Sequence, residues 1–401
     1  MTIQDRWLLP EGIEEILPPR AGRLEALRRR LLDLYRSWGY ELVVPPLIEY
    51  LESLLTGTGN DLDLQTFKLI DQLSGRLMGV RADVTPQAAR IDAHVLGGEG
   101  VRRLCYIATV LHARPDGLGG SRAPIQAGAE LFGHGGRESD LEVLTLMLET
   151  VVSCGLGQIH LDLGHVGVYR ALVRETGLDP DAEEELFSIM RRKALPELGD
   201  FIAGRSLPRG LADMLRRIPE LNGGPEILEE AREALAEAPG RVADALDDLA
   251  WLAARVSLRY PDVPVHIDLA ELRGYFYHTG AVFAAFQPGH GQALARGGRY
   301  DHIGEVFGRA RPATGFSTDL GLVLERLGPG EARVDGILVP ADAENESLAD
   351  TVSALREHGE RVVQALPGAS GGPADYACDR RLTQRAGRWV VVEAQQERKA
   401  R

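Results

Sequence analysis

The sequence predicts an α+β fold in which a sheet is flanked by helices and followed by a small C-terminal α/β unit. Short strand-like runs bounded by turn residues lie on both sides of a helix-rich, charged segment at about residues 168–260, which indicates a helical insertion between two sheet-forming halves. A Gly-Pro-Gly boundary at residues 328–330 then precedes a strand, a helix and two further strands. We therefore expect a core at residues 1–328 and a small domain at residues 329–401.

The first predicted element is an amphipathic helix from Ala21 to Trp38. Its apolar residues recur mostly at spacings of three and four, and arginines occupy the other face. Gly39 ends this helix, and residues 40–44 read as a strand that Pro45 and Pro46 close.

The remaining elements are predicted by the same periodicities. Residues 66–82 contain two strand-like runs joined by the turn-like DQLSG, and residues 141–155 form a helical pattern. Further core strands are expected at residues 104–112, 124–133, 158–164, 263–272, 280–286 and 296–300. In the C-terminal unit, strands are expected at residues 336–340, 361–366 and 388–394, with a helix at 344–359.

The composition is that of a soluble globular chain with an acidic balance. Its 401 residues carry a formal net charge of −14, and lysine occurs only at positions 68, 193 and 399. A protein that depends on phosphate contacts usually has a basic patch, because Lys and Arg release counterions on binding. The acidity therefore weakens a nucleic-acid-binding interpretation without excluding it.

The cysteines and the absence of long apolar segments favour a location in the cytoplasm. Cys105, Cys154 and Cys378 form no C-x-x-C pair and have no metal-ligand spacing, which favours a reducing cytoplasm. The N-terminus lacks the basic start and apolar run of a signal peptide, and no stretch approaches the ~18 apolar residues of a membrane span. We expect a cytoplasmic protein with no membrane association and no metal site.

Five short motifs occur in a recognisable order. They are Leu9–Gly12, Trp38–Glu41 followed by Val44–Glu49, Val80–Pro86, Leu272–Gly280 and Gly297–Asp301. Together they resemble the core of the class II aminoacyl-tRNA synthetases, and the histidine enzyme in particular, which implies an antiparallel sheet flanked by helices. Alone, Gly297–Asp301 is more often a hairpin turn and Arg81 more often an ion-pairing residue. The order of the motifs across residues 9–327 is what favours the resemblance.

By the same resemblance, the residues that activate an amino acid are missing. Charge develops on the α-phosphate of ATP, and losing one preorganised donor there costs on the order of a hundred- to a thousand-fold in rate. Leu111 stands in place of the motif 2 arginine, and Ala113 in place of its glutamate. In motif 3, Asp319 and Leu322 replace a glycine and an arginine, while Arg326 is either a displaced equivalent or a surface residue. We expect an inactive adenylation site and assign no catalytic residue.

An amino-acid pocket remains in the pattern. By resemblance, Asp83 and Thr85 would hold the α-amino group of the ligand. Gln126 and Glu130 would continue the polar lining, and Arg273 and Tyr300 would close the pocket. An ammonium group favours carboxylates, and an imidazole favours hydrogen bonds beside an aromatic wall. Asp83 is one methylene shorter than the family's glutamate, and Phe276 and His278 replace an aspartate and a tyrosine of the signature.

The stretches Leu54–Asp71 and Asp92–His94 are similar to the ATP phosphoribosyltransferase regulatory subunits, a family of histidyl-tRNA synthetase paralogues. This resemblance covers nearly the whole chain. It implies a non-catalytic subunit that docks on a short-form catalytic subunit, which joins phosphoribosyl pyrophosphate to ATP in the first step of histidine biosynthesis. It also implies a class II-type dimer, a requirement for the partner's activity, and histidine as feedback effector. No cofactor and no tRNA partner are implied.

Other functions stay open at this point. A working histidyl-tRNA synthetase would need the missing arginines, and a synthetase-like amino-acid ligase would need the same ATP machinery. A stand-alone synthetase-like amino-acid-binding module would share the pocket but act on another enzyme or on RNA. The sequence also leaves open whether histidine binds in the pocket or at a subunit interface, and what residues 168–260 do.

Overall fold

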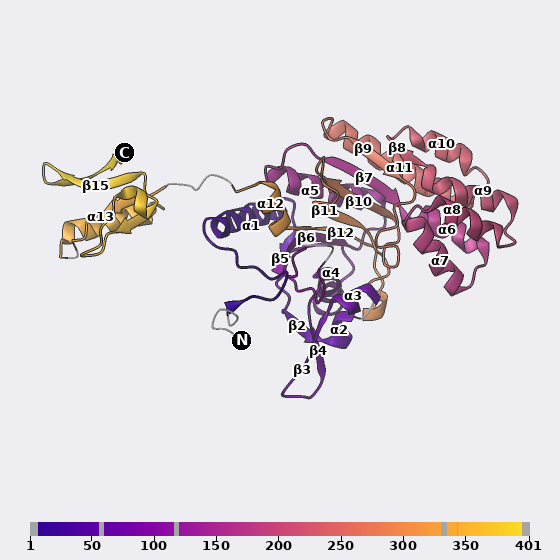
Figure 1. The fold of residues 1–401 in the computed structure, drawn as a ribbon, viewed down its shortest axis with the longest axis horizontal. Coiled ribbons are helices and arrows are strands. Elements are labelled where there is room, and N and C mark those ends of the chain that lie inside the picture. Colours follow the sequence, from indigo (N-terminus) through magenta and orange to yellow (C-terminus); the bar gives the residue numbers. More distant parts are fainter. Residues whose placement is uncertain (1–6, 56–59, 116–119, 330–334, 343, 395–401) are drawn as a thin grey trace. The chain divides into compact units, whose positions relative to one another are not determined.

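The computed structural model describes residues 7–55, 60–115, 120–329, 335–342 and 344–394. The chain divides into two compact units, Met1–Gly328 and Pro329–Arg401 (Figure 1). Within the described ranges, no helix is long and apolar enough to cross a membrane. The loop Asp116–Gly119 and part of the Leu54–Asp71 stretch lie outside the described residues.

A nine-stranded sheet forms the centre of the first unit, in the order β1-β5-β6-β12-β11-β10-β7-β9-β8. Its neighbouring strands are antiparallel except for the pairs β1–β5 and β7–β9. The strands are β1 (Glu41–Leu42), β5 (Arg102–Thr109), β6 (Ile125–Phe132), β7 (His160–His165), β8 (Asn222–Gly223), β9 (Val265–Asp268), β10 (Ala281–Phe286), β11 (Ala295–Arg299) and β12 (Ala313–Asp319). The predicted antiparallel sheet is confirmed, although the sequence did not indicate its two parallel pairs.

Three helices pack on one face of the central strands: α1 (Arg20–Ser37), α5 (Arg137–Ser153) and α12 (Leu320–Arg326) (Figure 1). The helices predicted at residues 21–38 and 141–155 are confirmed to within a few residues. α1 buries Leu31 and Tyr35, and the Tyr35 ring meets Phe316 of β12 edge-on. α5 is buried along most of its length because its sequence is apolar nearly all round. The opposite face of the sheet is left to carry polar side chains.

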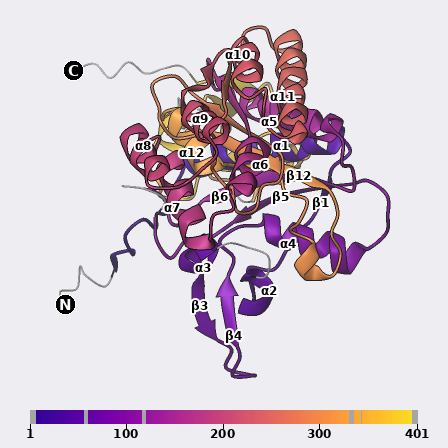
Figure 2. The ribbon, with the colours of Figure 1, turned by 90° about the vertical axis from the view of Figure 1, so that its right-hand side faces the viewer.

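A small antiparallel sheet, β2-β4-β3, projects from this unit (Figure 2). It consists of β2 (Ile48–Tyr50), β3 (Phe67–Ile70) and β4 (Leu77–Val80), so the hairpin predicted in residues 66–82 is confirmed. The strand predicted at residues 40–44 is shorter than expected, because only Glu41–Leu42 pairs in the sheet. Short helical segments surround the hairpin: α2 (Leu51–Leu55), α3 (Asn60–Gln65), α4 (Thr85–Arg90) and the π-helix η2 (Ile91–Leu96).

The segment predicted as a helical insertion is confirmed as helical. It contains α6 (Val166–Thr176), α7 (Pro180–Arg191), α8 (Leu195–Ala203), α9 (Arg209–Arg217), α10 (Ile227–Ala234) and α11 (Gly240–Arg259). Fully buried leucines such as Leu186, Leu215 and Leu249 form its interior. Asp179 caps α7 by accepting the Ala182 N–H at 2.9 Å, and Pro180 follows at the first helical position.

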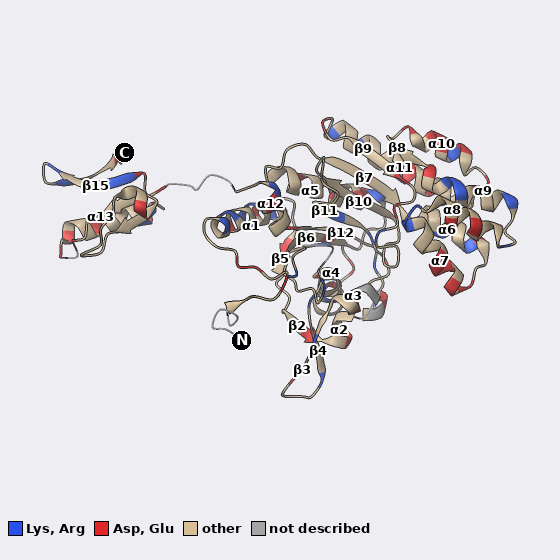
Figure 3. Cartoon of the chain, viewed as in Figure 1, with Lys and Arg blue, Asp and Glu red and all other residues tan. Residues whose placement is uncertain are grey.

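The second unit is a four-stranded sheet, β14-β13-β15-β16, with the helix α13 (Glu346–Glu357). Its strands are β13 (Ile337–Val339), β14 (Val362–Gln364), β15 (Arg380–Arg385) and β16 (Arg388–Glu393). The sequence prediction missed β15, which pairs with both β13 and β16, because Leu382 is its single apolar residue. Figure 3 shows basic residues along β15 and acidic residues on α13.

Candidate functional site

Glu130 is the centre of a buried polar cluster on the sheet face opposite α5. It lies on β6 with 1 % of its surface exposed. Thr85 Oγ1 donates to its Oε1 at 3.0 Å, Tyr106 Oη donates to the same oxygen at 2.9 Å, and Tyr300 Oη donates to Oε2. The donors come from α4, β5 and the residue after β11. Three segments that are distant in sequence therefore converge on one carboxyl group.

Burial changes the protonation of this cluster. It raises the pKa of the Glu130 carboxyl from its ordinary value of 4.5 to about 8, although the hydrogen bonds from Tyr300 and Tyr106 oppose the shift. Burial also raises the pKa of the Tyr106 and Tyr300 hydroxyls, so both remain protonated donors at neutral pH. The cluster therefore holds a carboxyl group that is mostly neutral at pH 7, which makes it a hydrogen-bonding site more than a charged one.

We expect the Glu130 carboxyl to make the protein less stable as the pH rises from about 6.5 to about 8. Its folded pKa lies above its unfolded pKa, so the folded state binds more protons in this window and stability falls, by up to about 1.4 kcal/mol per pH unit. The pKa values of the buried His165 and His278 are lowered from 6.5 to about 4, so these groups make stability rise with pH between about 4 and 6.5, and the window above 6.5 avoids most of their effect. Urea unfolding at several pH values should show a flatter profile for Glu130→Gln, and equal slopes in the two proteins would contradict this expectation.

Asp83 and Gln126 extend the cluster toward solvent. Gln126 lies four residues before Glu130 on β6, so its side chain is on the same face of the strand. Its Nε2 donates to Asp83 Oδ1 at 2.8 Å, and its Oε1 accepts the Val84 N–H at 2.9 Å. Asp83 is partly exposed, and among the described residues no hydrogen bond reaches its Oδ2. That oxygen can therefore accept from a ligand.

Two glycines form the floor beneath the cluster. A Cβ on Gly315 of β12 would lie 1.5 Å from Glu130 Oε2, and a Cβ on Gly128 of β6 would lie 2.5 Å from Tyr106 Oη. Both distances are far below van der Waals contact. The side chains of Glu130 and Tyr106 can therefore lie close against the sheet only because these two positions carry no side chain.

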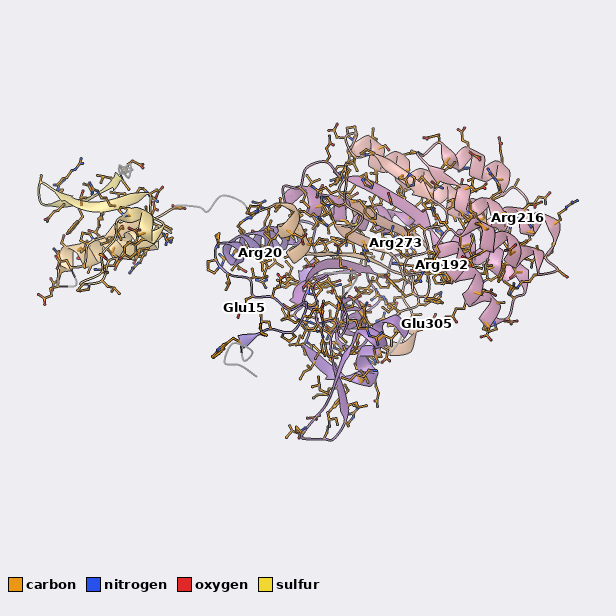
Figure 4. The ribbon with its side chains drawn as sticks, in the orientation of Figure 1. Glu15, Arg20, Arg192, Arg216, Arg273 and Glu305 are labelled. Atoms are coloured by element: carbon orange, nitrogen blue, oxygen red, sulfur yellow. The ribbon has the colours of Figure 1, made fainter. Side chains whose placement is uncertain are left out.

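The structure brings five of the six predicted pocket residues together: Asp83, Thr85, Gln126, Glu130 and Tyr300. The sixth, Arg273, which Figure 4 labels, pairs with Glu271 instead. Its Nε donates to both carboxylate oxygens of Glu271 at 2.9 Å, and its guanidinium carbon lies 5.2 Å from the centre of the Phe286 ring. Among the described residues, no hydrogen bond joins Arg273 to the other five.

Two tyrosines at the site were not assigned from the sequence. Tyr106 could have been identified from strand pairing, because β5 pairs with β6 so that Tyr106 lies opposite Gly128, between Gln126 and Glu130. Tyr277 lies in the predicted Leu272–Gly280 motif. It is 45 % exposed as a residue, yet its hydroxyl is desolvated, and desolvation followed by the negative charge of Asp83 raises its pKa. Among the described residues, the ring of Tyr277 contacts that of His278, with 4.1 Å between the ring centroids.

The resemblance to a synthetase would put ATP beside Asp319, Leu322 and Arg326, and two of these side chains contact other groups of the chain. Asp319 Oδ1 accepts the Gly321 N–H at 2.9 Å and the Ile125 N–H at 3.1 Å, so its carboxylate caps α12 and fixes the start of β6. Leu322 is buried, with 7 % of its surface exposed. Arg326 contacts His290 Nδ1 at 2.6 Å. An aspartate at this point opposes a phosphate both by charge and by occupying the backbone donors.

Two family models match the chain. One is described as histidyl-tRNA synthetase and matches residues 12–323; the other is described as ATP phosphoribosyltransferase subunit HisZ C-terminal domain and matches residues 334–392. A relative from Thioalkalivibrio sulfidiphilus, named ATP phosphoribosyltransferase regulatory subunit, is 59 % identical over 395 residues, which cover 98 % of this chain and 100 % of the relative.

Solved structures show the same fold. A protein from Bacillus halodurans, described as an ATP phosphoribosyltransferase regulatory subunit/histidyl-tRNA synthetase, has a TM-score of 0.81 at 26 % identity and covers 92 % of this chain and 96 % of its own. A chain of the ATP phosphoribosyl transferase (HisG:HisZ) complex from Thermotoga maritima has a TM-score of 0.58 at 19 % identity, covering 73 % of this chain and 96 % of its own. The second likeness concerns the fold alone.

Proposed function

The chain belongs to the family of ATP phosphoribosyltransferase regulatory subunits, and from this premise we propose that its polar cluster is the sensor through which histidine controls the catalytic subunit. The chain is a non-catalytic partner of that enzyme in histidine biosynthesis. We infer that the partner is a short-form catalytic subunit that needs this chain for activity. We also infer a cytoplasmic location, which suits free cysteines at Cys105, Cys154 and Cys378.

The groups that suit an amino acid are kept in this chain, whereas those that suit a nucleotide are gone. The free Oδ2 of Asp83 can accept from an α-ammonium group, and a charge-assisted hydrogen bond of this kind is among the stronger ones. The hydroxyls around Glu130 can exchange hydrogen bonds with an imidazole, which has one donor and one acceptor nitrogen when neutral. Asp319 meanwhile occupies the backbone donors of the former phosphate position. This combination supports amino-acid sensing without adenylation.

Histidine can regulate the complex only if it binds one state of the assembly more tightly than another. A pocket built from α4, β5, β6 and the segment after β11 is suited to this, because its walls come from separate segments whose spacing can differ between states. Histidine occupancy would then bias the assembly toward the inhibited state.

The decisive experiment is an assay of a short-form catalytic subunit with and without this chain, across a histidine titration. We expect phosphoribosyl transfer only when the chain is present, and a loss of activity as histidine rises. Co-elution of the two proteins distinguishes this function from a stand-alone amino-acid-binding module, which would neither co-elute nor change the rate. Full activity without the chain would refute the requirement, and activity insensitive to histidine would refute the sensor.

A class II-type dimer completes the proposal. The motif 1 segment leaves apolar side chains exposed, including Val44 at 83 % and Ile48 at 44 %, and the hairpin adds Ile70 at 60 %. Large apolar side chains that are exposed in a single chain are typical of an interface between subunits when they form a contiguous patch. Sedimentation should give twice the chain mass for the wild type, and Val44→Glu should shift it toward a monomer. A monomeric wild-type chain would exclude the dimer.

A further inference from the structure

The helical insertion holds a loop that borders the amino-acid pocket. The loop Leu272–Gly280 leads into β10, and its last residues contact the backbone oxygen of Arg299, the residue before Tyr300 of the polar cluster. Arg170 of α6 donates from Nη2 to the backbone oxygen of Tyr275 at 2.7 Å and to that of His278 at 2.8 Å. One guanidinium nitrogen of the insertion therefore ties two points of the loop together.

Aromatic side chains strengthen this connection. Phe187 of α7 is stacked on Tyr275, with ring centroids 5.1 Å apart, and meets Phe276 edge-on at 4.9 Å. Glu183, also on α7, accepts a hydrogen bond from Tyr275 Oη at 3.2 Å. Such aromatic pairs contribute beyond the area they bury. Phe276 itself is 62 % exposed, so Phe187 is one of the few groups that fix its position.

The other end of the loop is bonded to the pocket itself. His278 is 6 % exposed, and its Nδ1 lies 3.2 Å from the backbone oxygen of Arg299, which also accepts the Thr279 N–H at 2.7 Å. The next residue, Tyr300, donates to Glu130. A continuous set of contacts thus runs from α6 and α7, through the loop, to the buried carboxyl of the pocket.

We propose that Arg170 and Phe187 are positioning residues for the amino-acid pocket. They hold the loop Leu272–Gly280 so that His278 and Thr279 keep their contacts with Arg299, and through the adjacent Tyr300 the insertion sets the affinity of the pocket for its ligand. The inference rests on the proposed function only for the identity of that ligand, histidine. By linkage, a ligand that needs the loop in place also stabilises the contacts of α6 and α7 with it.

The test compares the full-length chain with Arg170→Ala, Arg170→Lys and Phe187→Leu. Arg174→Ala is the matched control, because Arg174 is an exposed arginine of the same helix with no hydrogen bond or ion pair among the described residues. Calorimetry measures the dissociation constant of histidine. Hydrogen exchange measures the amides of residues 272–280, and thermal unfolding checks that each variant is folded.

For Arg170→Ala we expect a dissociation constant raised at least about tenfold, because two hydrogen bonds to a charged group are lost, together with faster exchange confined to the loop. Arg170→Lys should recover part of both effects, Phe187→Leu should show smaller changes of the same kind, and Arg174→Ala should match the wild type. Loop exchange and histidine affinity in Arg170→Ala equal to those of Arg174→Ala would overturn the proposal. A wild-type chain that binds no histidine would instead refute the proposed function, while loop exchange still decides whether Arg170 holds the loop.

Discussion

Replacing Arg299 by alanine is expected to remove about 3–5 kcal/mol from the free energy of unfolding. Arg299 and its partner Asp140 are both buried, at 7 % and 4 % exposure, and Nε donates to Asp140 Oδ2 at 3.0 Å. The same guanidinium also donates to Ser139 Oγ at 2.9 Å and to the backbone oxygen of Gly136 at 3.0 Å. Its removal leaves the Asp140 charge buried without a counterion, which is the costly part of the change.

Urea unfolding at neutral pH measures this loss, with Arg174→Ala as a control that should unfold like the wild type. A loss below about 1 kcal/mol would show that Asp140 is solvated or neutral in the variant, contrary to the expected result. The outcome also bears on the Gly297–Asp301 motif. Its arginine holds β11 to the start of α5, while its tyrosine reaches the polar cluster, so one short motif serves both the fold and the site.

Replacing Asp83 by asparagine is expected to raise the histidine concentration needed for half-inhibition by about ten- to a hundredfold. The substitution keeps the shape of the side chain, and an asparagine oxygen can still accept the hydrogen bonds from Thr85 and Gln126. It removes the negative charge that would face the ammonium group of the ligand. The assay is phosphoribosyl transfer by the catalytic subunit in the presence of each variant, across a histidine titration.

Asp33→Asn is a suitable comparison, because Asp33 is an exposed carboxylate of α1 with no hydrogen bond or ion pair among the described residues. It should leave the titration curve in place. An unchanged curve for Asp83→Asn would show that the inhibitory histidine binds elsewhere, for example at the interface between the two kinds of subunit. Loss of activation in the absence of histidine would instead indicate that the substitution disturbs assembly.

The features that the sequence could predict depend on strong local patterns. α1 follows from apolar periodicity, α5 from a long apolar run, and the hairpin of β3 and β4 from two short runs and a turn. β15 could not be predicted in this way, because RRLTQR has one apolar residue and owes its conformation to pairing with β13 and β16. The strand conformation of β15 depends on pairing with strands elsewhere in the chain, which a short stretch of sequence does not reveal.

The site shows the same division. The resemblance placed Glu130 and Tyr300 in one pocket, and the structure joins them by a hydrogen bond. Tyr106 was missed because its role depends on the register between β5 and β6. Arg273 is a different case: a carboxylate two residues earlier, Glu271, competes for its guanidinium, and a motif match does not weigh such a local partner. Side-chain pairing was therefore harder to predict than backbone position.

The carboxylate at Asp319 has an evolutionary consequence. Reverting it to glycine would leave the N–H groups of Ile125 and Gly321 without their present acceptor, and an unmet buried donor costs about 1–3 kcal/mol. No compensating phosphate would bind at that stage, because Leu111 and Leu322 still offer no positive charge. Reversion at Asp319 alone is therefore expected to lower stability without restoring a phosphate site.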